Sequence, residues 1–127
     1  MRNFLLVASA IALTACHSAT PTPADVCAKL ATAGVATNCH RYTPQRINAR
    51  ASDAYEFDLP SVPGHGGVVL TFAKDDDYTA TVATYESMAM LTGPHRYGNQ
   101  KARIFVQFNE EAPPDVGDKA KAIVAGL

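Results

Sequence analysis

The chain has 127 residues and a formal net charge of −1. A chain of this length has room for a single domain with its own core and little more. Nucleic-acid-binding proteins normally present a strongly basic face, and the 11 Lys and Arg residues form no such cluster, so nucleic acid is excluded as an expected partner.

The N-terminus has the pattern of an export signal. Arg2 places a positive charge before an uncharged, mainly apolar run from Phe4 to Leu13, which is typical of a signal peptide. The run has about half of the ~20 residues that a transmembrane helix needs, so a permanent span is not expected. We predict that residues 1–15 are removed.

The end of this segment, Leu13-Thr14-Ala15-Cys16, resembles the lipobox of bacterial lipoproteins, in which a leucine and two small residues precede a cysteine. The resemblance implies diacylglycerol transfer to Cys16, cleavage before it and acylation of the new N-terminus. Several acyl chains on one residue hold a protein firmly on a membrane. His17 replaces the aspartate that marks inner-membrane retention in enteric bacteria, so the resemblance favours the outer membrane.

The other two cysteines, Cys27 and Cys39, remain as a pair once Cys16 carries the lipid. Exported compartments favour disulfides. The alternatives are two free thiols or metal ligation, but Cys39-His40 alone lacks the paired ligand spacing of a zinc site. We predict a Cys27–Cys39 disulfide, which stabilises the fold by about 3 kcal/mol on the chain-entropy model.

After the lipid site, residues 16–23 are small, polar and rich in proline, which predicts a tether. A single domain is then expected over residues 24–127. Its first helix is predicted over 24–33, because Asp25 suits the positive end of the helix dipole and Gly34 suits the left-handed position after the last turn. The polar stretch 41–52 is expected to be irregular.

Three later segments have strand patterns, and two have helix patterns. Residues 55–59 and 102–108 alternate in polarity, whereas 68–72 is a short apolar run. The glycine-rich turn 63–67 joins the first two strands. A helix is expected after Asp75-Asp76-Asp77, ending at Gly93-Pro94, and a last helix begins at Pro113-Pro114 although Gly117 weakens it.

The predicted order is therefore α-β-β-α-β-α, an α+β domain with a small three-stranded antiparallel sheet. A crossover through the central helix places the third strand beside the first, which gives the strand order 2-1-3. All the helices are then expected on one face of the sheet.

No catalytic or cofactor motif is recognisable. Part of a calcium-loop spacing is present after residue 75, but Ala80 replaces the glycine that the loop requires, so a helix start is the better interpretation. The four histidines show no i, i+4 pair, and no serine lies in a G-x-S-x-G context. We expect no enzyme activity, no cofactor and no metal; a small-ligand or metal-binding lipoprotein and a hydrolase of unrecognised type are the alternatives.

The polar segment between residues 93 and 103 is the predicted contact surface. His95, Arg96, Tyr97 and Lys101 combine cationic groups with an aromatic ring. Such a surface suits another envelope protein or a cell-wall component, while the lipid anchor supplies the contact with the membrane. The alternative is a solvated connection between a helix and a strand.

The lipid anchor can be tested directly. We expect Cys16→Ser to abolish both acylation and signal removal, because the thiol accepts the diacylglycerol on which cleavage depends. Metabolic labelling with a fatty-acid analogue and the mass of the product measure the two steps. Continued labelling of the variant would show that another residue carries the lipid.

Overall fold

The computed structural model describes residues 20–127, so the predicted signal peptide, Cys16 and His17 lie outside the described residues. The elements in chain order are α1 (Pro23–Thr32), β1 (Thr37–Arg41), a 3-10 turn η1 (Arg46–Asn48), β2 (Asp53–Asp58), β3 (Gly66–Thr71), α2 (Asp75–Ser87), α3 (Ala89–Thr92), β4 (Arg96–Asn99), β5 (Ile104–Phe108) and α4 (Pro114–Ala125). From residue 20 onwards, no helix is long and apolar enough to cross a bilayer.

The domain is α+β, but the prediction of a three-stranded sheet is wrong. The sheet has five antiparallel-paired strands in the order β1-β2-β3-β5-β4. The three predicted strands are β2, β3 and β5. The two edge strands were missed because β1 (TNCHR) and β4 (RYGN) have no apolar alternation and bury little of their surface.

The predicted order 2-1-3 is also wrong, because β5 lies beside β3 and not beside β2. The chain leaves β3, runs through α2 and α3 to the far edge as β4, and returns as β5 into the space between them. Strands β3 and β4 are therefore parallel with β5 between them, the arrangement of a split βαβ unit. Because β4 was not predicted, the crossover through the helices was expected to end at β5.

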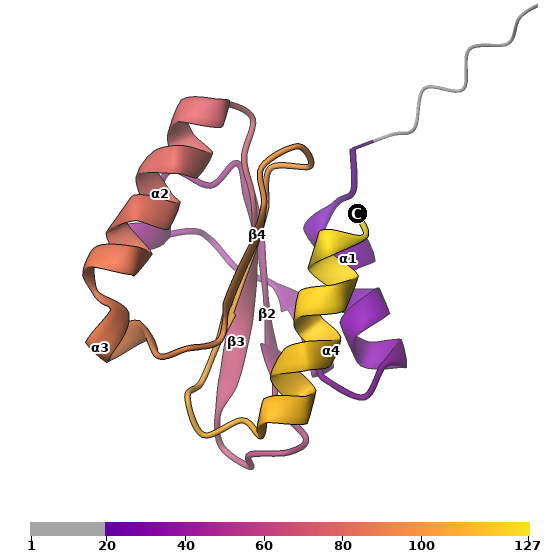
Figure 1. The fold of residues 1–127 in the computed structure, drawn as a ribbon. Helices are drawn as coiled ribbons and strands as arrows, with labels where there is room; N and C mark the ends of the chain where they lie inside the picture. The colour runs from indigo at the N-terminus through magenta and orange to yellow at the C-terminus, as the bar shows by residue number, and fades with distance from the viewer. Residues whose placement is uncertain (1–19) are drawn as a thin grey trace, which may run out of the picture.

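Helices cover both faces of the sheet, which corrects the expectation of a single covered face (Figure 1). Helices α1 and α4 pack on one face, where they enclose the larger core with Phe57, Val69 and Phe108. Helix α2 packs on the other, over a second core that includes Leu70 and Phe105. Because β3 and β5 contribute to both cores, their two faces are both partly apolar and a one-sided alternation cannot describe them.

The predicted disulfide is present. Cys27 of α1 is bonded to Cys39 of β1, with the two Cα atoms 6.1 Å apart. Cys39 is the one side chain of β1 that is partly buried, whereas its four neighbours are exposed. The disulfide therefore attaches an otherwise polar edge strand to the core beneath α1.

A chain of hydrogen bonds holds η1 against α2. The Tyr85 hydroxyl donates to Asn48 Oδ1 at 2.7 Å, and Asn48 Nδ2 donates to the Tyr42 hydroxyl at 2.7 Å. Burial raises the pKa of Tyr85 to about 12, so it remains a donor at neutral pH. This contact closes the second core on the side of β2.

Gly67 allows the two neighbouring strands to meet over β3. It pairs with Phe57 on one side and with Phe108 on the other, and the two rings meet edge to face at 6.3 Å. A Cβ at Gly67 would lie 2.5 Å from the Phe108 Cβ and 2.7 Å from the Phe57 ring. Because Gly67 has no side chain, the two phenylalanine rings can occupy this space.

We expect Gly67→Ala to lower the free energy of unfolding by roughly 1–3 kcal/mol, because the added methyl group overpacks this contact. Urea denaturation measures the change. Gly126→Ala is the matched control, since its Cβ would lie 3.4 Å or more from its neighbours, and it should change stability by less than about 1 kcal/mol. If Gly67→Ala were as stable as the wild type, this close contact would not constrain the fold.

Candidate functional site

A row of side chains crosses all five strands on the face covered by α2. The register pairs His40 with Glu56, Glu56 with Val68, Val68 with Gln107 and Gln107 with Arg96. Directly paired residues point to the same face of a sheet, so the five form one line. Helices α2 and α3 cover its Arg96 end, where Arg96 Nη1 donates to the Tyr85 carbonyl and Gln107 Nε2 to the Thr92 carbonyl.

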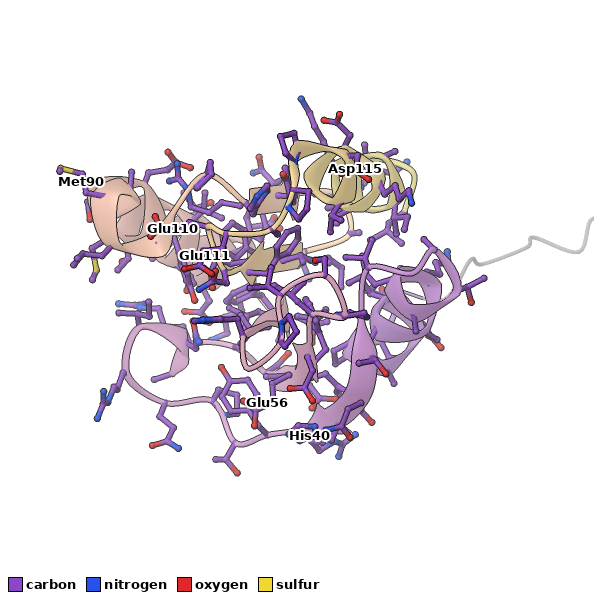
Figure 2. The ribbon with its side chains drawn as sticks, turned by 90° about the horizontal axis from the view of Figure 1, so that it is seen from below. His40, Glu56, Met90, Glu110, Glu111 and Asp115 are labelled. Atoms are coloured by element: carbon purple, nitrogen blue, oxygen red, sulfur yellow. A yellow bond between two sulfur atoms is a disulfide. The ribbon has the colours of Figure 1, made fainter. Side chains whose placement is uncertain are left out.

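The other end of the row is open and forms a polar cleft of about 440 Å³. The lining comes from four strands and from the β2–β3 turn: His40, Glu56, Phe57, Asp58, Gly64, His65, Gly66, Gly67, Val68 and Gln107. Figure 2 shows His40 and Glu56 side by side on β1 and β2. Glu56 also lines a second depression, of about 550 Å³, beside η1.

Two oxygen atoms hold the His40 ring. Nδ1 lies 2.8 Å from the Asn38 carbonyl and Nε2 lies 3.0 Å from Glu56 Oε1. Both ring nitrogens can donate only in the imidazolium form, so the Asn38 carbonyl and then Glu56 raise the pKa of His40 above 6.5. The Asn38 carbonyl reaches the ring because the register shifts before His40 and Asn38 is left-handed, with φ of 52°.

His65 links the β2–β3 turn to the loop before α4. Asn109 Nδ2 donates to His65 Nδ1 at 3.0 Å, and His65 Nε2 lies 4.0 Å from Glu111 Oε2. The Asn109 backbone N–H also donates to the Gly66 carbonyl at 3.1 Å. The cleft wall formed by this turn is therefore attached to the end of β5.

The chemistry of the cleft suits hydrogen bonding to a polar ligand. Its lining combines carboxylates, imidazoles, an amide and glycine backbone, and the described residues that line it include no Ser, Thr or Cys nucleophile. Within residues 20–127, no group of three or more His, Cys, Asp or Glu side chains is arranged to hold a metal ion.

Of the predicted contact residues, His95 is buried, with only 6% of its surface exposed. Its Nε2–H donates to the Ala112 carbonyl at 2.8 Å, and Nδ1 accepts from the Tyr97 hydroxyl at 2.9 Å. The ring stacks on Phe108 at 4.7 Å. Gly117 lets α4 approach this pair closely, since a Cβ there would lie 2.6 Å from His95 Nδ1 and from the Tyr97 hydroxyl.

The remaining two predicted residues lie elsewhere. The Arg96 side chain is on the opposite face of the sheet from His95, is 15% exposed and forms an ion pair with Glu86 at 3.0 Å. Lys101 is exposed in the β4–β5 turn. The structure thus brings the His95 and Tyr97 side chains together. It places Arg96 on the opposite face of the sheet and Lys101 in the exposed turn.

The acidic residues with partial calcium-loop spacing do not converge either. Asp75, Asp77 and Glu86 form ion pairs with three different arginines, at 2.7 Å, 3.3 Å and 3.0 Å. All three lie on α2, which begins at Asp75 with three acidic residues in its first turn. The helix interpretation of this segment is confirmed.

Sequence reasoning missed the cleft because its polar residues lie on separate segments. His40 and Glu56 are sixteen residues apart and meet only through the β1–β2 register. Comparisons with known protein families, curated proteins and solved structures find no match to this chain.

The pairing of His40 with Glu56 gives a pH-dependent prediction. In the wild type, the pKa of His40 in the folded state should lie above 6.5, so protonation of His40 stabilises the fold below the unfolded-state pKa, and this contribution is lost as the pH rises through the folded-state pKa. Glu56→Gln should lower the pKa of His40, as measured by NMR titration of its ring protons. The control is Glu111→Gln, because Glu111 lies near His65 and not near His40. If Glu56→Gln left the pKa of His40 unchanged, the pairing would be contradicted.

Proposed function

We propose that the protein is a lipid-anchored lipoprotein of the bacterial cell envelope whose domain binds another envelope protein or a cell-wall component without catalysing a reaction. The lipobox resemblance at Leu13-Thr14-Ala15-Cys16 supports the anchor, and His17 supports an outer-membrane location. The domain would then be held at the membrane, with the residues between Cys16 and α1 as its tether.

The open polar cleft is the observation that carries the binding function. It offers the carboxylates of Glu56 and Asp58 as hydrogen-bond acceptors, beside the His40 ring that Glu56 and the Asn38 carbonyl hold in place. Peptides and glycans present amide and hydroxyl groups, which these side chains complement. An open depression suits part of a large ligand better than a small molecule, because drug-sized ligands are usually bound in sites that bury most of their surface.

The position of the cleft supports the same function. The chain enters the domain at the end of the molecule where it also terminates, near the β4–β5 turn, while the β2–β3 turn lies at the opposite end (Figure 1). The Asn99 side chain donates to the Val124 carbonyl at 2.9 Å, which fixes the C-terminus at that first end. A protein anchored at Cys16 would therefore present the wall formed by the β2–β3 turn away from its membrane.

Binding can be tested with isolated peptidoglycan sacculi and with chemical cross-linking in the intact envelope. We expect the double variant His40→Ala/Glu56→Ala to weaken sacculus co-sedimentation, or the yield of a specific envelope cross-link, by about tenfold, because it removes the cleft's paired charges. These side chains are about half exposed, so the fold should persist in circular dichroism.

A matched control exists on the same two strands. Arg41 and Asp53 form an exposed ion pair at 3.4 Å outside the cleft, and Arg41→Ala/Asp53→Ala should leave binding unchanged. Equal loss in both double variants would assign the effect to the edge strand as a whole. Undiminished binding by the cleft variant would place the interaction elsewhere on the protein.

A further inference from the structure

Two large apolar side chains project into solvent from α3. Met90 is 96% exposed and Leu91 is 82% exposed, whereas the polar Thr92 beside them is buried. This is the reverse of the usual preference, in which the apolar side chains turn inward. We refer to residues 89–94 as the α3 tip.

Hydrogen bonds to Thr92 impose this orientation. Its Oγ1 donates to the Tyr85 carbonyl at 3.1 Å, and its own carbonyl accepts from Gln107 Nε2 at 2.9 Å. Gly93 continues in a left-handed conformation, with φ of 72°, and packs against Glu110. The helical turn is thus tied to α2 and β5, so Met90 and Leu91 are held outward.

A shallow hollow lies beside Met90. It has a volume of about 360 Å³ and is lined by Ala89, Met90, Gly93, Pro94, Arg96 and Glu110. The lining is mainly small and apolar, with one exposed carboxylate at Glu110. Interface anchors are typically apolar side chains that fill such hollows.

The exposed charge around the tip is negative. Glu86, Glu110 and Glu111 are all exposed, and Figure 2 shows Met90, Glu110 and Glu111 on the same side of the molecule. Arg96, the one cation lining the hollow, is largely buried and already pairs with Glu86. An approaching cation would therefore meet the exposed Glu110 carboxylate beside apolar surface.

We infer that the α3 tip is a docking surface for a basic amphipathic segment of a protein partner. An apolar side chain of that segment fills the hollow beside Met90, and a Lys or Arg residue meets Glu110. A membrane surface fits less well, because carboxylates repel anionic head groups, and a second copy would set the same acidic groups against each other. The inference uses the proposed function only to place the partner in the envelope.

The test is photo-cross-linking in the producing cell, with a benzophenone amino acid at position 90 of the full chain. We expect an adduct to a protein, and mass spectrometry should find that the cross-linked peptide carries net positive charge and apolar residues. The yield should fall at least fivefold when Leu91→Ser or Glu110→Lys is added. The benzophenone at position 101, at the other end of the molecule, is the control and should not give this adduct.

Several results would overturn the inference: a phospholipid adduct, an adduct to a second copy, an acidic or uncharged partner segment, no adduct, or a yield that Glu110→Lys leaves unchanged. Thermal unfolding of each variant shows whether the fold persists, and Leu91→Ser, at an exposed position, keeps the test valid if Glu110→Lys unfolds. Sacculus binding and fatty-acid labelling in the same strains report on the proposed function separately. Loss of the tip adduct with cleft binding intact would reject only the docking surface.

Discussion

The fold depends on the close approach of Phe57 and Phe108 over Gly67, at the centre of the sheet. The contact sets the register of three strands at once, because Gly67 pairs with both phenylalanines. Phe108 in turn supports the His95 ring, on which the first half of α4 packs through Gly117. The absence of a side chain at Gly67 therefore allows the contact on which the packing of the larger core and of α4 depends.

The same register produces the candidate site on the opposite face. The strand pairing brings Phe57, Gly67 and Phe108 together beneath α4. Because side chains alternate along a strand, the same pairing aligns the adjacent residues on the other face, which are Glu56, Val68 and Gln107. Helices α2 and α3 cover one end of this line, and the uncovered end is the cleft. A shift of one residue would exchange the two faces and destroy the core and the cleft together.

The two candidate binding surfaces also lie away from the point where the chain enters the domain. The chain enters and terminates at one end, while the α3 tip and the β2–β3 turn lie at the other (Figure 1). The tip combines apolar surface with carboxylates, and the cleft pairs an imidazole with a carboxylate, so the two surfaces suit different chemical groups. Under the two proposals above, a wall component and a protein partner would bind at separate places on the domain.

The sequence alone was sufficient for features that depend on neighbouring residues. The helix beginning at Asp75, the strands around residues 55–59 and 68–72 and the Cys27–Cys39 pairing follow from local periodicity, dipole charges and cysteine count. Edge strands β1 and β4 could not be predicted, because main-chain hydrogen bonds to their neighbours hold them in place and apolar alternation does not. The cleft, the buried His95 and the exposed Met90 depend on register and on helix packing, which join residues distant in the chain. Only the tertiary structure decided them, because side-chain exposure is set by what packs above each residue and not by its own polarity.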